Sequence, residues 1–114
     1  MSRNISLYLE DIVKSCEKVL RFTKDMSREM FLQDEKTYDA VVRNLEIVGE
    51  AAKNVPNEIR EKIPNIEWRK MGGMRDILSH GYFGIDDDIL WDVVRNKVPR
   101  LAEEVSQFLG KNQV

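Results

Sequence analysis

The sequence predicts an all-α protein, an antiparallel bundle of four to five helices, and three observations support this prediction. Apolar residues recur three and four positions apart over four long stretches, no stretch alternates between apolar and polar residues, and prolines and glycines fall mostly between the stretches. The 114 residues are enough for one modest core. We therefore expect a single helical domain over residues 1–114.

The first two long helices are expected over residues 5–23 and 35–54, where an apolar stripe returns with each helical turn. The stripe residues are Ile5, Leu9, Ile12, Cys16 and Val19 in the first helix, and Tyr38, Val42, Leu45, Gly49 and Ala52 in the second. Asp34 suits the N-cap of the second helix, because its carboxylate can accept a backbone N–H. Residues 25–33 mix polar and apolar side chains, which predicts a loop with about one helical turn.

Prolines punctuate the middle of the chain. Pro56 suits the first turn of a short helix over residues 56–62, and Pro64 ends that helix. Asn65 is the expected cap of a third long helix that runs from residue 66 to residue 79 or 80. Gly81 and Gly84 then mark the end of this helix.

Three consecutive acidic residues, Asp86, Asp87 and Asp88, open the last helix, and one of them is the expected cap. The apolar stripe of this helix is Leu90, Val94, Leu101, Val105 and Phe108. Pro99 lies inside the pattern and predicts a kink or a break, and Gly110 is expected to close the helix.

Composition narrows the class of protein. The net charge is −2, so any nucleic-acid binding must come from a local basic cleft rather than from a basic surface overall. No apolar run approaches the roughly 20 residues of a membrane span, and no signal-peptide core follows the N-terminus. A single cysteine, Cys16, excludes an internal disulfide and is expected to be buried and inert. These features predict a cytoplasmic protein without membrane association.

The chemistry is concentrated in the segment RDILSHGY, residues 75–82. His80 is the only histidine, and Asp76, four positions earlier, could orient its imidazole. Arg75 lies five positions before His80, about 140° away around a helix, so these two converge only if the helix ends near Gly81 or a second subunit completes the site. Tyr82 returns to the face of Arg75 and could be a packing aromatic, a substrate-orienting hydroxyl or a modification site.

Two glycines, Gly72 and Gly73, precede this segment inside the helical pattern. They indicate either a helix start or kink, or a close backbone approach to another helix or subunit. Glu50 is a candidate partner for Arg75, although a solvated surface carboxylate is the simpler interpretation. Trp68 and Trp91 are interpreted as core or interface anchors rather than as platforms for bases, and the methionines as gap-fillers.

An ordered set of segments resembles the HepT-like toxins, a branch of the HEPN-domain ribonucleases. The family motif of Arg, four residues, His, one residue and Tyr matches Arg75, His80 and Tyr82. The other matching segments are NLEIVGEAA (residues 44–52), WRKMGGMRD (68–76), YFGID (82–86), LW (90–91) and VPRL (98–101).

The resemblance implies a dimeric endoribonuclease that cuts RNA without a metal, in the cytoplasm. Such cleavage needs an acid, a base and a cation for the phosphate, and we assign proton transfer to His80 and phosphate stabilisation to Arg75, with Asp76 in support. One histidine per chain gives an independent reason to expect a homodimer, whose shared cleft would also gather Arg69 and Lys70 for phosphate binding.

No metal or cofactor is expected. One histidine and one cysteine cannot supply the usual ligands of a zinc site. The three aspartates could hold a hard cation only with further oxygens, and helix capping is the expected role for them.

The resemblance also implies a toxin–antitoxin pair. Its partner would be an MntA-type nucleotidyltransferase antitoxin that adenylylates Tyr82 and so places negative charge where RNA phosphate binds. The alternative is a non-catalytic helical partner of a nucleotidyltransferase, in which Arg75, His80 and Tyr82 form a docking surface.

Overall fold

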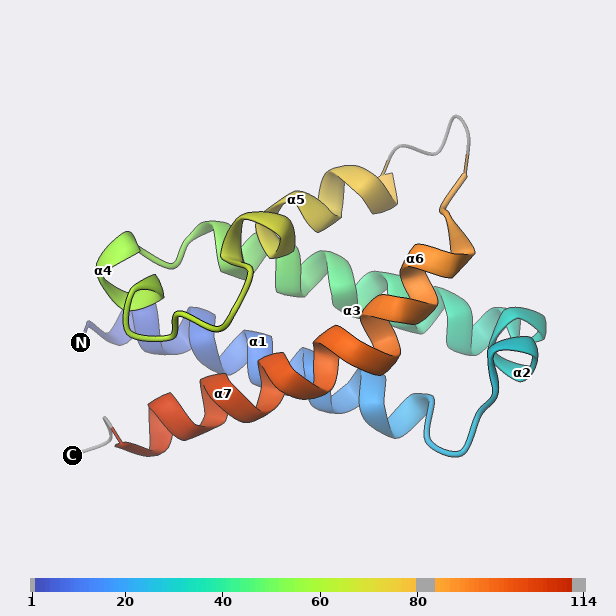
Figure 1. The fold of residues 1–114 in the computed structure, drawn as a ribbon, viewed down its shortest axis with the longest axis horizontal. Coiled ribbons are helices and arrows are strands. Elements are labelled where there is room, and N and C mark those ends of the chain that lie inside the picture. The colour runs from blue at the N-terminus through green and yellow to red at the C-terminus, as the bar shows by residue number, and fades with distance from the viewer. Residues whose placement is uncertain (1, 80–83, 112–114) are drawn as a thin grey trace.

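The computed structural model describes residues 2–79 and 84–111, and describes only the backbone of Arg75, Asp76, Ile77 and Ser79. Within these residues the chain is all-helical and contains no strand, which confirms the predicted helical bundle (Figure 1). In chain order the segments are α1 (Arg3–Phe22), α2 (Arg28–Gln33), α3 (Glu35–Lys53), α4 (Asn57–Arg60), α5 (Trp68–Ser79), α6 (Asp87–Asp92), the π-helical η1 (Val93–Lys97) and α7 (Val98–Lys111).

Helix α1 is the centre of the packing, because it contacts α3 on one side and α7 on the other. Helix α5 packs on α3 and runs antiparallel to it, so that α5 ends near the point where α6 begins (Figure 1). The motif of residues 75–82 therefore begins within α5 and precedes α6 in the chain. In the described part of the chain, no helix is long and apolar enough to cross a membrane.

The predicted apolar stripes form the core, except that the buried face of α3 is rotated relative to the predicted one. Leu9, Ile12, Cys16 and Val19 of α1 are fully buried, as expected. On α3 the buried face is turned relative to the prediction, because Val41 and Val48 are fully buried while Tyr38 and Val42 are only partly so. Tyr38 instead stacks on Phe31 of α2, with ring centroids 5.4 Å apart.

Side chains cap the helices where the sequence places them. The Asp34 carboxylate accepts the N–H of Thr37 at 3.1 Å and its hydroxyl at 2.9 Å, and these bonds lower the pKa of Asp34. Asp86 caps α6 by accepting the N–H groups of Asp88 and Ile89. Both expected caps are confirmed, and Ser27 caps α2, which fills much of the segment expected to be a loop.

Two predicted helix starts are wrong. Asn65 is not a cap, because α5 begins at Trp68, two residues later than the predicted first residue, Ile66. The preceding turn is held by the core: Ile66 is buried, and the Trp68 indole donates to the Ile63 carbonyl at 3.0 Å. Pro56 is the N-cap of α4 rather than a member of its first turn, and α4 ends at Arg60.

The last helix is distorted but not broken at Pro99. The chain is helical from α6 through α7, and the π-helical segment η1 lies directly before the proline, with Val98 N–H donating to the Val93 carbonyl. Because Pro99 cannot donate to the carbonyl of Arg95 and its ring crowds that carbonyl, a wider turn accommodates it. Gly110 does not close the helix, since α7 continues to Lys111.

Burial on α1 predicts a sharp contrast between two neighbouring leucines. Replacing Leu9, which is 0% exposed, with alanine should lower the free energy of unfolding by about 2–5 kcal/mol, because it leaves a cavity in the core. Leu7 on the same helix is 45% exposed, and Leu7→Ala should cost less than about 1 kcal/mol. Urea unfolding followed by circular dichroism measures both, and equal losses would contradict the role given to α1.

Candidate functional site

The described residues frame the motif of residues 75–82 without including all of it. The backbones of Arg75 and Asp76 lie in the second half of α5, so both residues are helical as predicted. His80 and Tyr82 lie outside the described residues. The chain re-enters the described part at Gly84, which has a φ of 77° that favours glycine, and Asp86 then caps α6.

A groove of about 470 Å³ lies between α5 and the α6–η1 segment, next to the motif. On α5 the groove is lined by Met74 and Leu78, which precede and follow Arg75 in the sequence. Ile85 and Asp86, which follow the motif, line it as well. The apolar floor is formed by Leu45, Met71, Met74, Leu78 and Leu90, all buried. We call this the α5–α6 groove.

The glycine pair has two distinct roles. A Cβ built on Gly72 would lie 3.3 Å from Cγ of Lys53, so α5 approaches α3 closely there, which supports the close-approach interpretation for this residue. A Cβ built on Gly73 meets nothing within 4 Å, and Gly73 lines the α5–α6 groove. Its missing side chain leaves the groove wall open.

An ionic trio closes one end of this groove. The Glu67 carboxylate pairs with Lys70 of α5 at 2.7 Å and with Lys97 of η1 at 2.9 Å. Hydrogen bonds from both ammonium groups and their charges lower the pKa of Glu67 to about 2, and the same contact raises the pKa of Lys70. The trio ties α5 to η1 and carries a net charge of +1 near neutral pH.

Each aspartate at the start of α6 has its own partner. Asp86 caps the helix, Asp87 accepts the Tyr38 hydroxyl at 2.7 Å, and Asp88 pairs with Arg28 at 2.6 Å. Their expected structural role is confirmed for Asp86, and the other two anchor α6 to α3 and α2. Among the described residues, no group of three His, Cys, Asp or Glu is arranged to hold a metal ion.

Aromatic and cationic contacts extend this anchor. Trp91 stacks on Phe31 with ring centroids 5.3 Å apart, and the Arg95 guanidinium lies 4.4 Å from the Trp91 centroid. Arg95 also donates to the carbonyls of Thr23 and Met26 in the loop that joins α1 and α2. Burial, together with the hydrogen bond to Asp87, raises the pKa of Tyr38 to about 12, so its hydroxyl stays a donor near neutral pH. The α6–η1 segment, which follows the motif by a few residues, is thus tied to α2, α3 and the loop before α2.

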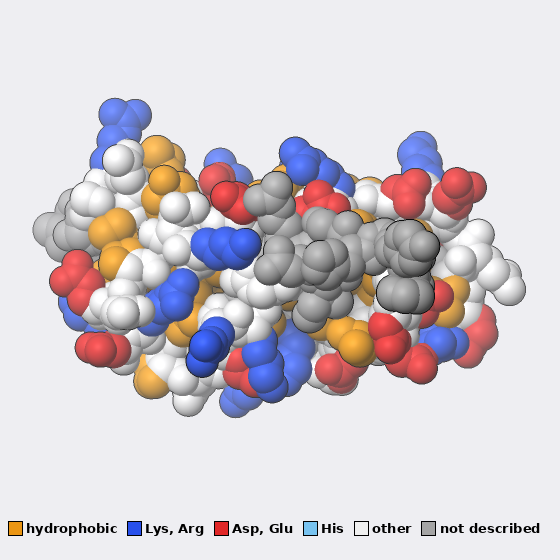
Figure 2. Space-filling model, turned by 90° about the horizontal axis from the view of Figure 1, so that it is seen from above, with side chains coloured by type: hydrophobic (Ala, Val, Ile, Leu, Met, Phe, Trp, Pro, Cys, Tyr) orange, Lys and Arg blue, Asp and Glu red, His pale blue; other side chains and the backbone are white. Residues whose placement is uncertain are grey.

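Figure 2 shows one face of the molecule, on which Lys and Arg side chains are more frequent toward one end and Asp and Glu side chains toward the other, with both kinds present at each end. Lys70 of α5 and Lys97 of η1 line the α5–α6 groove, and Lys97 and Arg100 of α7 line a small hollow that shares Glu67, Met71 and Lys97 with it. Both residues predicted to bind phosphate, Arg69 and Lys70, are exposed, and Lys70 engages Glu67. Lys70, Lys97 and Arg100 therefore form a small basic surface at the groove, in which each of these side chains also pairs with a glutamate.

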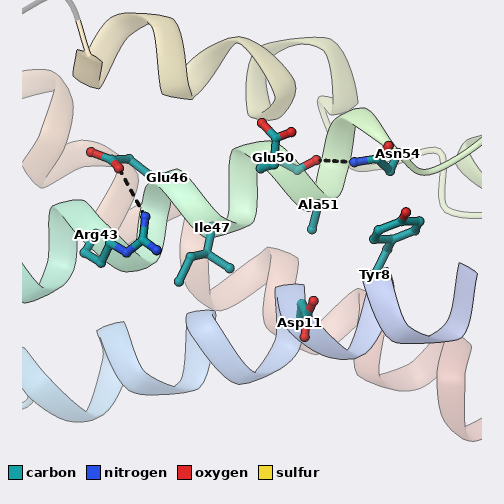
Figure 3. A pocket seen from close by; sticks show the side chains of 8 residues that line it. All are labelled: Tyr8, Asp11, Arg43, Glu46, Ile47, Glu50, Ala51 and Asn54. Atoms are coloured by element: carbon teal, nitrogen blue, oxygen red, sulfur yellow. Dashed lines mark hydrogen bonds and ion pairs between the residues drawn. The ribbon is translucent and has the colours of Figure 1, made fainter. Parts of the chain in front are cut away.

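A second hollow, of about 390 Å³, lies between α1 and α3 (Figure 3). Tyr8 and Asp11 of α1 face Arg43 and Ile47 of α3 across it. Glu50 lines its edge, but Figure 3 shows the Glu50 side chain pointing away from α1. Glu50 is exposed, and the suggested pairing with Arg75 involves a side chain that is not described.

The remaining residues singled out in the sequence are structural. Cys16 is fully buried, and burial, with a smaller contribution from the charge of Glu17, raises the pKa of its thiol to about 12, so it is unreactive near neutral pH. Trp68 is a core anchor as predicted, and Met71 and Met74 are buried. Sequence reasoning missed the partners of Glu67 and Arg95, because nothing local in the sequence marks contacts across 30 or 69 residues.

Comparisons with known proteins agree on one family. The model of the family described as Ribonuclease HepT-like matches residues 12–108. A "Probable ribonuclease HepT" from Thermococcus cleftensis is 48% identical over 101 residues, which cover 89% of this chain and 92% of the relative. A "Putative RNase" from Methanocaldococcus jannaschii is 44% identical over 103 residues, 90% of this chain and 94% of the relative. No solved structure gives a significant match.

The anchor of α6 predicts a specific effect of one hydroxyl. Tyr38→Phe keeps the ring on Phe31 but leaves Asp87 without this donor, so the free energy of unfolding should fall by about 1–2 kcal/mol. Tyr8→Phe, a matched change on α1, should alter it by less than about 0.5 kcal/mol. Urea unfolding measures the free energy of unfolding of both variants. Equal effects would show that the hydrogen bond to Asp87 does not stabilise the fold.

The ionic trio predicts a pH dependence. The folded pKa of Glu67, about 2, lies below its ordinary value of 4.5, so its ion pairs stabilise the fold above about pH 4.5 and are lost as the pH falls toward 2. The stability difference between wild type and Glu67→Gln should therefore be largest near neutral pH and shrink through this window. Thermal unfolding at low ionic strength measures it, and a difference independent of pH would argue against the trio.

Proposed function

This chain belongs to the HepT-like ribonuclease family, and we propose that it is a metal-independent endoribonuclease whose active site is built from Arg75 and His80 at a dimer cleft. Family membership makes it a ribonuclease of the HEPN type, with RNA as its substrate. The observation that carries the finer proposal is that the region matched by the family model, residues 12–108, contains the whole motif of residues 75–82.

The proposed reaction uses the ribose of the substrate as nucleophile. A base takes the proton from the 2′-hydroxyl, whose oxygen attacks the adjacent phosphorus, and an acid protonates the 5′-oxygen that leaves. The products are a 2′,3′-cyclic phosphate and a 5′-hydroxyl. Imidazole can serve as base or acid near neutral pH, and a guanidinium fork suits the crowded phosphate oxygens. His80 and Arg75 would fill these roles, with Asp76 orienting His80.

A homodimer would supply what one chain lacks. The reaction needs both an acid and a base, and each chain holds one histidine. Two copies around a twofold axis would bring two histidines and two arginines to one cleft. They would also double the basic groups near the motif, including Arg69 and Lys70, which favours RNA binding by a protein with a net charge of −2.

We further propose that the protein is the toxin of a toxin–antitoxin pair. An MntA-type nucleotidyltransferase antitoxin would transfer an adenylyl group from ATP to the Tyr82 hydroxyl and release pyrophosphate. The added phosphodiester would place negative charge close to Arg75 and His80, in competition with the substrate phosphate. The competing proposal, a non-catalytic partner of such a transferase, is favoured only by the acidic net charge.

Cleavage of RNA in the presence of EDTA tests the catalytic proposal. Purified wild type should cut total cellular RNA and leave 2′,3′-cyclic phosphate ends, and His80→Ala should be slower by about 10²–10⁴-fold, the usual contribution of a general acid or base. Arg69→Ala, outside the motif, should weaken binding more than turnover. Cutting by His80→Ala at the wild-type rate would contradict the assignment, as would a requirement for added metal.

Intact mass measures the state of Tyr82 in the same sample. Incubation with a cognate nucleotidyltransferase, ATP and Mg²⁺ should add one adenylyl mass to wild type and none to Tyr82→Phe, and the modified protein should lose its activity. Wild type that stays unmodified would remove the adenylylation step. An unmodified wild type that also cuts no RNA would favour the non-catalytic partner.

A further inference from the structure

We propose that the α5–α6 groove binds a nucleobase of the RNA strand, next to the phosphodiester bond that is cut. The inference rests on the proposed ribonuclease function and adds to it a pocket that recognises the substrate. It assigns the base to the apolar floor of the groove and the neighbouring phosphates to the basic surface beside it. The pocket belongs to a single chain and is formed by α5, α6 and η1.

The position of the groove supports this assignment. Met74 and Leu78 line it and bracket Arg75 in the sequence, and Ile85 lines it just after the motif ends. Met74 directly precedes Arg75 in the sequence, so the groove begins one residue from the backbone of the residue assigned to the phosphate. In the proposed complex, a nucleotide whose phosphate is bound by Arg75 places its own base, or the next one, in this groove.

The chemistry of the floor suits the face of a base. Met71 and Met74 supply thioether groups, which contact aromatic rings favourably, and the leucines add flat apolar surface. Ile89, which also lines the groove, is 49% exposed and adds accessible apolar surface to it. The volume, about 470 Å³, falls within the range of small-ligand pockets, about 300–1,000 Å³. Stacking on such surfaces is a common way to hold unpaired RNA bases.

The groove offers both cations and hydrogen-bond acceptors. The trio of Glu67, Lys70 and Lys97 is cationic overall and can attract a phosphate. Asp86 and Asp92 also line the groove. One oxygen of Asp86 accepts N–H groups of α6 and one oxygen of Asp92 accepts the Asn96 amide, which leaves the second oxygen of each to accept an N–H group of a base. This combination fits a nucleotide better than a wholly apolar protein segment.

Gly73 offers a direct way to fill the groove. It lies in the wall, and a side chain added there meets no atom of this chain within 4 Å of its Cβ. Gly73→Leu should therefore fold as well as wild type, because leucine is also the better helix former. Gly110→Leu is the matched control, since Gly110 is also helical and equally open but lies on α7, outside the groove.

The experiment measures binding of two labelled 12-residue oligonucleotides by fluorescence anisotropy. One is a 2′-O-methyl oligoadenylate, which cannot be cut because it lacks the 2′-hydroxyl, and the other has the same backbone without bases. Gly73→Leu should weaken binding of the oligoadenylate about tenfold or more, as loss of a stacked base does, and should leave binding of the abasic strand unchanged. Gly110→Leu should match wild type with both strands.

Other outcomes would overturn the inference. Wild-type affinity of Gly73→Leu for the oligoadenylate, or an equal loss for both strands, would show that no base enters the groove. Conversion of a dimer to a monomer by Gly73→Leu alone, seen in sedimentation velocity, would assign the groove to a second copy of the chain. Failure of wild type to bind either strand would contradict both the proposed base pocket and RNA binding by this protein. The expected binding pattern in a protein that cuts no RNA would keep the pocket and reject the catalytic proposal.

Discussion

The burial of the apolar stripe of α1 is the constraint on which the rest of the structure depends. Leu9, Ile12, Cys16 and Val19 are fully buried, and α1 contacts both α3 and α7. Helix α5 packs on α3 rather than on α1, so the position of α5 depends on the position of α3. The motif on α5 is thus positioned through two successive helix contacts, each governed by close packing of side chains.

Helix α6, which follows the motif, is positioned by polar contacts in addition to the burial of Leu90 and the stacking of Trp91 on Phe31. Asp87 and Asp88 tie α6 to Tyr38 and Arg28, and Arg95 holds the loop between α1 and α2. Such directional bonds fix an orientation as well as a distance. The described chain on one side of the motif is thus helix α5, which packs on α3, and on the other side helix α6, which combines apolar packing with directional hydrogen bonds and an ion pair.

The sequence predicted the main helices correctly, but it did not predict the contacts between them. Stripes at helical spacing predicted α1, α3 and the last helix, and Asp34 and Asp86 were recognisable as caps because capping is local. The rotated face of α3 was missed, since Tyr38 packs on Phe31 of α2 and donates to Asp87, which is 49 residues away in the sequence. The start of α5 was misplaced because burial of Ile66 outweighs the capping preference of Asn65. The motif was found by resemblance, and spacing alone could not bring Arg75 and His80 together.

The π-helical turn η1 has a consequence for the helical phase on its two sides. A turn closed by a bond from Val98 to Val93 holds one residue more than an α-helical turn, so the helix after it is rotated relative to a continuous α-helix. Leu90 before the turn, Val94 within it, and Leu101 and Val105 after it nevertheless are all buried in the core. The additional residue in the π-helical turn compensates for the difference between the spacing of these residues and the period of an α-helix. The apolar residues before and after the turn therefore stay on the same side of the helix.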